Sequence, residues 1–558
     1  MAEARSELGA ALWRLADLVR ADERRRSFRA KAYRRAVWSL DDLSPDLSDP
    51  PETILSTPGI GAGVLRLIIE FEETGSLDLL DRLEQLYPTD VSTMRRLPRM
   101  TPSILRLLKG ELGVETTEQL RGAIESGGVE ALRGVGPGTA ERWDRAIALA
   151  PARGVVPAFQ AWVLAETLAR HLQRHLGGVV EPAGQVRTME EWVEVVELVA
   201  AVSDPPTGRE FLESTAVARF LGFGESGEVI LRSHDDVEVR AHLVSPDQAA
   251  PRLLMITGPS GHARAILDAA GGVTTSESDI YAAGGRIWIP PPARGLPHEV
   301  AAEVIRLGHV RGDLHLHSDL SPDGRMSLDE ILIEAVDRGY EYVLITDHTS
   351  GLRFGGLTEA GLEDQAAEIE EVRSRFPDLV VLHGAELNIT RDGDLDIADE
   401  TLSMLDLAVA GLHSFFDLTR DEQTARIIRA LSHPVVRVLA HPTGRRIGAR
   451  PPVELDIEAV IAAAVDHDAA LEVNGHRDRL DLSATHAALA ASAGALLAAD
   501  SDAHRVGEMG NIANSVATMQ RAGVSPESVV NTWAATRFMA WVRGGAPAGV
   551  SGQPETGS

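Results

Sequence analysis

The spacing of hydrophobic and polar residues changes along the chain and divides it into regions of different expected structure. Over residues 5–40 apolar residues recur every three or four positions, which predicts amphipathic helices. Over 53–150 the helical pattern is interrupted by glycine turns, and over 160–300 helical and strand-like stretches are mixed. From 310 to 545 short apolar runs alternate with alanine-rich helical stretches, which is typical of a parallel sheet or barrel. The sequence therefore predicts a multidomain α/β protein.

Two glycine-rich turns lie in the helical first part of the chain. The segments Thr57-Pro-Gly-Ile-Gly-Ala-Gly and Leu132-Arg-Gly-Val-Gly-Pro-Gly share a Gly-apolar-Gly turn that leads into a helix. The N–H groups at such a helix start can bind a phosphate, and this helix–hairpin–helix motif grips the DNA backbone without reading bases. The simpler interpretation is an ordinary helix–helix turn that needs glycine.

The repetition of the motif favours the DNA-binding interpretation. A third segment, 97–105, stands where another copy would be expected but lacks both glycines, and a basic segment lies nearby. Residues 1–40 contain ten Arg or Lys against five Asp or Glu. We therefore predict weak, sequence-independent binding of the DNA backbone. The residues expected at the DNA are Gly59, Gly61, Gly63, Gly134, Gly136, Gly138, Lys31, Arg34 and Arg35.

The strongest chemical signal lies at the ends of the strand-like runs in the C-terminal region. Seven runs end in a histidine, a carboxylate or, once, an asparagine. In a β/α barrel these ends meet at one face, where such enzymes place their chemistry. The run-terminal residues are His315 and His317, His348, Glu386, His413, His441, Asn474, and Asp502 with His504.

These residues have the types and spacing of metal ligands. The pairs His315/His317 and Asp502/His504 are two positions apart, so on an extended chain both side chains of a pair point the same way. A single histidine after an apolar run is usually a hydrogen-bonded core or surface residue, but that interpretation does not account for six of them. With Asp323 the candidates number nine, too many for one ion, so we expect two or three ions.

Imidazole and carboxylate ligands without thiolates suit Zn, Mn or Fe, and Mg is a further candidate. Such clusters hydrolyse phosphoesters with metal assistance. We expect His315, His317, Glu386, His413 and Asp502 to take part in catalysis. Residues expected to orient the ligands or to contact the substrate phosphate are Asp347, Arg353, Arg445, Asn474, Arg479 and Asp500.

Composition excludes several other classes of protein. The chain has 558 residues, 44% of them hydrophobic, and no cysteine, which excludes disulfide scaffolds, iron–sulfur clusters and thiol nucleophiles. No apolar run approaches the ~20 residues that cross a bilayer. The net charge of −29 argues against a surface coated with nucleic acid and leaves local binding. We expect a cytoplasmic, monomeric enzyme without a membrane partner.

The ordered set of nine residues resembles the PHP (polymerase and histidinol phosphatase) family. The matching motifs are His315-x-His317, Asp323, Thr346-Asp-His348, Glu386, His413, His441-Pro and Asp502-x-His504. The resemblance implies a distorted seven-stranded β/α barrel with a trinuclear metal centre. It also implies that each of the nine residues is a ligand and that Glu386 bridges two ions.

The region before the barrel resembles bacterial family X DNA polymerases. Phe28-Arg-Ala-Lys-Ala-Tyr resembles the DNA-end-binding helix, Thr257-Gly-Pro-Ser-Gly-His resembles a palm segment, and Ile289-Pro-Pro-Pro-Ala-Arg resembles a thumb segment. The resemblance implies five regions. They are an N-terminal helical DNA-end-binding domain with a helix–hairpin–helix (1–90), a fingers-like helix–hairpin–helix domain (91–155), a degenerate nucleotidyltransferase palm and thumb (156–305), the PHP barrel (306–545) and a disordered tail (546–558).

The resemblance fails at the positions that would carry polymerisation. The family has Asp-x-Asp on one palm strand and a third Asp on a neighbouring strand. Counted from Gly184, these positions are Val195, Glu197 and Arg240. Two Mg²⁺ ions need converging carboxylates, and a guanidinium at one position repels them. We therefore predict that nucleotidyl transfer is lost or severely weakened.

Three functional hypotheses remain open at the level of sequence. The first is a DNA-directed phosphoesterase, a 3′–5′ exonuclease or end-processing repair enzyme. The second is a small-molecule phosphomonoesterase of the histidinol-phosphatase kind. The third is a non-catalytic DNA-bound scaffold. The intact set of nine candidate ligands argues against it, because these residues have no evident packing role.

Overall fold

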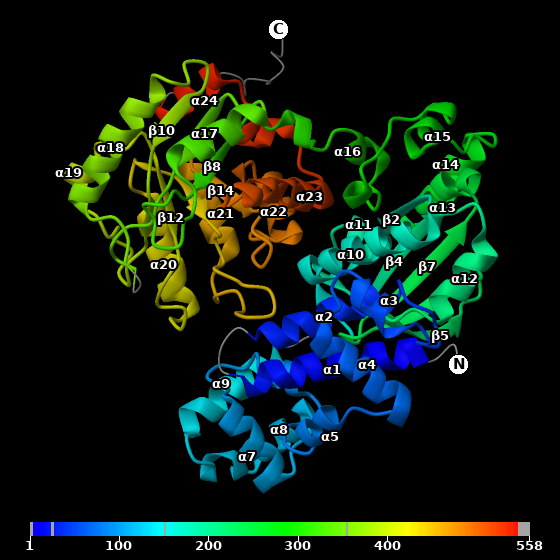
Figure 1. Ribbon diagram of the computed structural model, residues 1–558. Helices are drawn as coiled ribbons and strands as arrows, with labels where there is room; N and C mark the ends of the chain where they lie inside the picture. The colour runs from blue at the N-terminus through cyan, green and yellow to red at the C-terminus, as the bar shows by residue number, and fades with distance from the viewer. Residues whose placement is uncertain (1–3, 24–26, 150–151, 353–354, 545–558) are drawn as a thin grey trace. The chain divides into compact units, whose positions relative to one another are not determined.

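The computed structural model describes residues 4–23, 27–149, 152–352 and 355–544 (Figure 1). The chain folds into two compact units, Met1–Gly285 and Arg286–Ser558. Among the described residues, no helix combines the length and the hydropathy that a membrane span requires.

The first part of unit 1 is helical. Its helices are α1 (Ala4–Asp22), α2 (Phe28–Leu40), α3 (Pro51–Ser56), α4 (Ala62–Thr74), α5 (Asp78–Glu84), α6 (Val91–Met94), α7 (Pro102–Leu112), α8 (Thr117–Glu125), the 3₁₀ helix η1 (Gly128–Ala131) and α9 (Pro137–Ala148). The leucines spaced along α1 are fully buried, and this helix packs against α2, α5 and α6. The Ser27 hydroxyl accepts from the Ala30 N–H and starts α2, and a capping box of Thr116 and Gln119 starts α8.

The second part of unit 1 is a sheet covered by helices. Its elements are β1 (Val156–Pro157), α10 (Ala158–Leu176), β2 (Val179–Ala183), α11 (Gly184–Arg187), β3 (Trp192–Val193), β4 (Val195–Ala201), α12 (Pro205–Glu213), β5 (Ala218–Phe223), β6 (Val229–Ser233), β7 (Glu238–Val244), α13 (Ala249–Thr257), α14 (Ser260–Ala269) and α15 (Glu277–Ala283). The main sheet has the order β2-β4-β7-β6-β5, in which only β4 and β7 are parallel. Helices α10 and α13 pack against β2 and β4.

Unit 2 alternates strands and helices. Its elements are η3 (Pro291–Ala293), α16 (His298–Ala302), β8 (Gly312–Leu316), α17 (Leu328–Asp337), β9 (Tyr342–Ile345), α18 (Glu359–Arg373), β10 (Val380–His383), β11 (Glu386–Asn388), α19 (Asp399–Leu402), β12 (Ala408–Gly411), α20 (Arg420–Leu431), β13 (Val436–Ala440), α21 (Ile457–Asp466), β14 (Ala470–Asn474), α22 (Ala484–Ser492), β15 (Leu496–Asp500), α23 (Ile512–Ala522) and α24 (Ala535–Val542).

All strand pairs in unit 2 are parallel. They form the sheets β10-β9-β8 and β11-β12-β13-β14-β15. Single parallel bridges, His348↔Glu386 and Leu316↔Ala503, connect the two sheets at either side. The strands are buried almost throughout, as parallel strands covered by helices are. This topology brings the carboxyl ends of all the strands to one end of the unit.

The other end of the strands is covered by the C-terminal helix. Phe538 of α24 stacks on Tyr342 of β9, with ring centroids 4.0 Å apart. Trp533 and Trp541 join the same buried cluster. The aromatic residues of α24 therefore complete the core beneath the sheets.

Two features differ from the expectation. The expected strand ending at Glu386 is two strands, β10 and β11, because the chain passes from one sheet to the other between them. At this step a Cβ on Gly384 would lie 2.7 Å from the Leu407 carbonyl oxygen, which explains the glycine. The chain also divides after Gly285, whereas we expected a boundary at residue 305. The segment 286–305 belongs with unit 2, where η3 packs on α23 and the Ile305 N–H donates to the Val524 carbonyl.

Candidate metal centre

The structure brings all nine predicted ligands together at the carboxyl ends of the strands of unit 2. His315 lies in β8 and Glu386 begins β11, whereas the other seven follow the strands in short loops. Most of these side chains are buried, and Asp323 is the most exposed. The remaining members are His317, His348, His413, His441, Asp502 and His504.

Glu386 is the centre of the cluster. Its Oε1 lies 2.9 Å from His413 Nε2 and 2.8 Å from His441 Nε2. Its Oε2 lies 2.9 Å from His348 Nδ1 and 3.3 Å from His315 Nε2. His317 Nε2 lies 3.6 Å from the same Oε2, so five imidazoles surround one carboxylate, two at Oε1 and three at Oε2.

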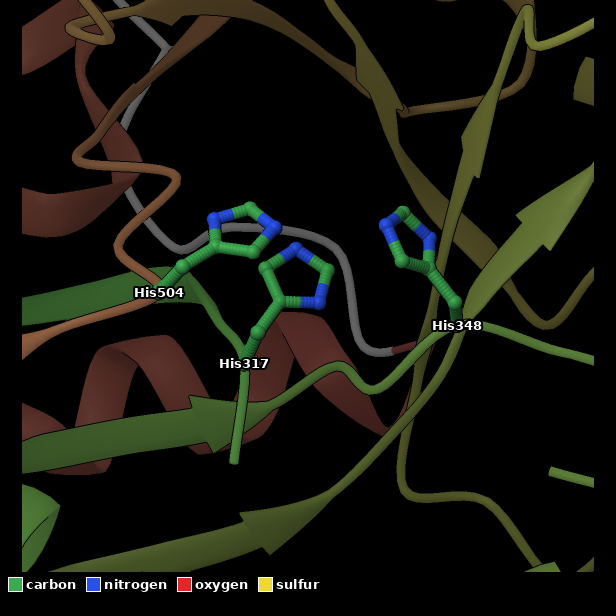
Figure 2. A group of neighbouring side chains, drawn as sticks. All are labelled: His317, His348 and His504. Atoms are coloured by element: carbon green, nitrogen blue, oxygen red, sulfur yellow. The ribbon is translucent and has the colours of Figure 1, made fainter. Parts of the chain in front are cut away.

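A second group lies beside the first. Figure 2 shows the rings of His317, His348 and His504 gathered together, from the loops after β8, β9 and β15. The ring centroid of His317 lies 4.5 Å from that of His348 and 4.2 Å from that of His504. Asp323 Oδ2 lies 3.4 Å from His504 Nε2 and 3.7 Å from His348 Nε2. Asp502 Oδ1, 3.4 Å from His317 Nε2, joins this group to the first.

The donor atoms of these residues fit a cluster of divalent cations. Three groups have ligand atoms that all lie within 4.8 Å of one another: His317/His348/His504, His315/His317/Asp502 and His348/Glu386/His413. The Nε2 atoms of His315 and His317 are buried without a hydrogen-bond partner among the described residues. Buried polar atoms without partners are costly, and bound cations would satisfy them.

The electrostatics of the cluster also favour cations. The pKa of Glu386 lies well below its usual value, because the surrounding histidines, His413 first, outweigh the burial that opposes ionisation. Burial also disfavours the charged form of His348, but Glu386 and Asp323 raise the pKa of His348 to about 10. The carboxylates therefore attract positive charge to the space between them.

The backbone is strained at two of the candidate ligands. His441 has φ of 29° and Asp502 has φ of 53°, in the left-handed region that residues with a side chain rarely adopt. Strained residues persist where the surroundings fix them, and they cluster at functional sites.

Glu472, a residue that the sequence analysis missed, holds three candidate ligands from behind. It is fully buried in β14, and its Oε1 lies 2.7 Å from His315 Nδ1. Its Oε2 accepts from the His441 N–H at 2.5 Å and from Asn474 Nδ2 at 3.0 Å, and Asn474 also donates to Asp502. Such contacts fix the orientation and tautomer of a ligating histidine. Its position two residues before Asn474, on the same strand face, is the signal that could have found it.

Asp347 and Asp500 support the loops rather than the cluster itself. Asp347 accepts from the Ser318 N–H at 2.7 Å and from the Ser318 hydroxyl. Asp500 Oδ1 accepts from the Leu314 N–H and from Asn531 Nδ2, both at 2.9 Å. Burial raises the pKa of Asp347 to about 6.

Of the three predicted phosphate-binding arginines, Arg479 reaches the cluster. Its Nε lies 3.1 Å from Asp502 Oδ2, and its Nη1 is buried without a hydrogen-bond partner among the described residues. Arg445 donates to the carbonyl oxygens of Arg479 and Leu480, so it supports the loop that carries Arg479. Arg353 lies outside the described residues.

The two glycine turns lead into helices whose N-termini have no side-chain cap. Gly61 and Gly136 are the N-cap residues of α4 and α9 and make no such bond. Gly59 and Gly134 need glycine because their φ angles are 96° and 92°. Gly61, Gly63, Gly136 and Gly138 would meet nothing within 4 Å if they carried a Cβ, so neither packing nor φ requires glycine there.

The glycine-free third segment forms the same turn. Met100 N–H donates to Leu97 O at 3.1 Å, as Ile60 does to Thr57 and Val135 to Leu132. Arg99 takes the place of the first glycine with φ of 60°. Thr101, the N-cap residue of α7, differs from Gly61 and Gly136 because its own hydroxyl accepts from the Ile104 N–H.

Two of the three basic residues predicted at the DNA are exposed. Lys31 and Arg35 are exposed on α2. Arg34 instead pairs with Asp17 and lies over the Trp13 ring, 4.2 Å from its centroid.

The positions at which the sequence analysis expected the carboxylates of a polymerase lie on β4 and β7. Glu197 of β4 lies opposite Arg240 of β7, and Val195 lies opposite Glu238. Glu197 Oε2 contacts His242 Nε2 at 2.6 Å, and Arg240 pairs with Glu238 at 2.7 Å. Both acids are therefore engaged by neighbouring side chains within the sheet, Glu197 by His242 and Glu238 by Arg240.

Comparison with known proteins gives relatives for the whole chain and for unit 2 alone. Residues 313–488 match the PHP domain family. The DNA polymerase/3′-5′ exonuclease PolX of Bacillus subtilis is 31% identical over 90% of this chain and 93% of its own length. Probable phosphatases of Edwardsiella ictaluri and Shigella dysenteriae are 28% and 27% identical, each over 39% of this chain and 89% of its own length.

Proposed function

Because the chain belongs to the PolX family, bacterial family X DNA polymerases that carry a PHP domain, we propose that it is a metal-dependent phosphoesterase acting on DNA. The reaction is 3′–5′ exonucleolytic cleavage or end processing during repair. The observation that carries the proposal is the convergence of nine His, Asp and Glu side chains around Glu386.

The parts of the molecule have distinct roles in this proposal. The three-stranded and five-stranded sheets of unit 2 form a distorted eight-stranded barrel rather than the seven-stranded one expected, with the cluster at the carboxyl ends of its strands. Residues 1–90 act as the DNA-end-binding region, residues 91–155 as the fingers-like region and residues 156–285 as the degenerate palm, whereas the thumb-like segment 286–305 packs within unit 2. The hairpin glycines at 59–63 and 134–138, with Lys31 and Arg35, hold the DNA backbone.

The residues of the cluster act on a phosphodiester at the strand end. Two or three divalent ions held by the nine residues would supply an activated water and neutralise the phosphate charge. The water oxygen bonds to phosphorus as the bond from phosphorus to the 3′ oxygen of the preceding nucleotide breaks. That 3′ oxygen takes up the proton of the water and becomes the new 3′ hydroxyl, and the terminal nucleotide is released as its 5′-monophosphate. Glu472 and Asn474 hold His315 and Asp502 in place, and Arg479 donates to the phosphate with its unpartnered Nη1.

Polymerisation is lost or severely weakened. Val195 offers no carboxylate, Arg240 places a cation where one is needed, and Glu197 is held by His242. We expect no extension of a gapped primer by the purified protein with Mg²⁺ or Mn²⁺.

A second candidate is a small-molecule phosphomonoesterase, which the phosphatase relatives of unit 2 favour. The deciding experiment supplies Mn²⁺ with a 3′-labelled strand and, separately, a simple phosphomonoester, and compares the wild type with His315→Ala. Shortening of the strand that His315→Ala abolishes supports the proposal. Release of phosphate from the monoester alone supports the alternative, and inactivity toward both contradicts each.

A further inference from the structure

One aromatic side chain at the rim of the cluster has an unusual backbone and an unusual exposure. Phe415 is 42% exposed and has φ of 55°. A bulky residue in the left-handed region is a conformational outlier. It follows the candidate ligand His413 by two residues, so its Cα lies within about 7 Å of that ligand's Cα.

Two buried polar residues of α20 hold the turn in this conformation. Gln423 Nε2 donates to the Phe415 carbonyl at 2.7 Å, and Arg426 Nη2 donates to the Ser414 carbonyl at 3.0 Å. Arg426 also donates to Gln423 Oε1 at 2.9 Å, and both side chains are almost fully buried. The fold therefore fixes an unfavourable backbone at this position and leaves the phenyl ring partly in solvent.

The Arg426 guanidinium lies 6.0 Å from the Phe415 ring centroid, and the neighbouring ring lies closer to a cation. Phe416 is half-buried, and the guanidinium of Arg450 lies 3.7 Å from its ring centroid. Arg450 belongs to the loop that follows His441, another candidate ligand. Next to the cluster, the chain thus presents an exposed aromatic ring and a cation, which match the base and the phosphate of a nucleotide.

We infer that Phe415 is the platform on which the terminal base of the substrate strand stacks. The inference rests on the proposed function and gives it a substrate class: the site recognises a nucleotide with its base, not a bare phosphoester. Stacking on aromatic side chains does not depend on which base is present, which suits an enzyme that shortens any sequence.

The test compares two 3′-labelled oligonucleotides that differ only in the last residue, a normal nucleotide or an abasic tetrahydrofuran. The wild type with Mn²⁺ should cleave the normal end about 5- to 150-fold more efficiently in kcat/KM. Phe415→Gly, which accommodates the positive φ and so should fold at least as stably, should bring the ratio toward one. Phe415→Trp should preserve the ratio.

The matched control is Met404→Ala. Met404 is 41% exposed but precedes β12, at the end opposite Phe415. This variant should keep the wild-type ratio. An unchanged ratio in Phe415→Gly, or no wild-type preference for the normal end, overturns the inference.

A binding measurement separates this inference from the proposed function. Calorimetric titration of the Mn²⁺-loaded wild type and Phe415→Gly with thymidine monophosphate and with deoxyribose 5-phosphate needs no cleavage. If neither oligonucleotide is cut, the proposed function fails. Phe415 is then judged by whether its substitution weakens binding of thymidine monophosphate but not of the sugar phosphate.

Discussion

At the scale of single residues, the candidate ligands could be predicted because chemistry and position coincide in them. Eight of the nine stand at the end of an apolar run, and a parallel sheet brings such ends together, whereas Asp323 lies in the loop after the first run. The rule that ligands follow the end of a run does not find Glu472, because this residue lies inside the buried strand β14, where a charged side chain is rare. Phe415 was missed because nothing in a sequence reveals a positive φ at a residue other than glycine.

Removal of Glu472 should weaken metal binding. Glu472→Ala leaves His315 Nδ1 and the His441 N–H without their acceptor, and loss of such a partner weakens metal affinity by about 10- to 100-fold. Glu472→Gln should have a metal affinity between those of the wild type and Glu472→Ala, since the amide keeps a single acceptor oxygen. Equilibrium dialysis with elemental analysis measures bound Mn²⁺. Glu454→Gln, at an exposed acid of the same unit, should bind as the wild type does, and equal binding by Glu472→Ala contradicts the role.

At the scale of elements, the three hairpin turns show what the sequence could and could not predict. The two glycine turns were readable from their motif, and the structure gives their first glycines the positive φ that the motif requires. The third turn adopts the same geometry with Arg99, although the motif is lost. A contact with another helix holds this turn, because Trp143 Nε1 of α9 donates to the Pro98 carbonyl at 2.8 Å. Its helix is capped by Thr101 and offers less to a phosphate.

An aspartate at the glycine caps should repel DNA without harming the helices. Gly61→Asp and Gly136→Asp each supply a favourable N-cap and place a negative charge where a phosphate would bind. We expect each to weaken DNA binding by about 1–2 kcal/mol, roughly tenfold, with an unchanged melting temperature. Fluorescence anisotropy with a gapped duplex at low salt measures the affinity. Thr101→Asp, at the self-capped helix, should have little effect, and three equal losses would contradict the assignment.

A buried polar network ties α1 to the sheet of unit 1. Asp41 accepts from the Thr215 hydroxyl at 2.5 Å and the Ala216 N–H at 2.7 Å, and it contacts Arg5 at 3.2 Å and His171 at 2.8 Å. Burial opposes ionisation of Asp41, but the hydrogen bonds from His171, Thr215 and Ala216 lower its pKa below the usual value. The ionised carboxylate therefore stabilises the folded state.

Unit 1 should lose stability in acid because of Asp41. The pKa of Asp41 is lower in the folded than in the unfolded state, so ionised Asp41 stabilises the folded state at pH values above its unfolded pKa of about 4. This stabilisation is lost as the pH falls through the folded pKa. Asp41→Asn should cost about 3–5 kcal/mol at neutral pH, because it leaves Arg5 buried without its counter-charge, and should flatten the acid dependence. Urea unfolding between pH 3 and 7 measures both effects, and parallel pH profiles for the two proteins would refute the assignment.

At the scale of the whole molecule, the sequence predicted the parallel strands of unit 2 but not the position at which the two units divide. The alternation of runs and helices over 310–545 gave the parallel architecture of unit 2. The division after Gly285 could not be read, because it depends on tertiary contacts such as Ile305 with Val524. The helical region and the mixed sheet, expected as separate regions, form one compact unit in the structure.

Chelation should therefore destabilise unit 2 alone. The candidate ligands all lie in unit 2, and a cation that binds only the folded state stabilises it. Removal of metal should lower the unfolding temperature of one calorimetric transition by about 5–10 °C and leave the other in place. His315→Ala, already deficient in metal, should respond less. Equal shifts of both transitions, or no shift, would contradict the assignment to unit 2.

The bridge between Leu316 and Ala503 has a consequence for biosynthesis. Asp502 and His504 are the neighbours of Ala503 in this bridge. Helix α24 follows them in the sequence and covers the end of the strands opposite the cluster. A chain interrupted before residue 502 lacks two candidate ligands and one of the two bridges that join the sheets. The phosphoesterase activity proposed above thus requires the chain at least as far as His504.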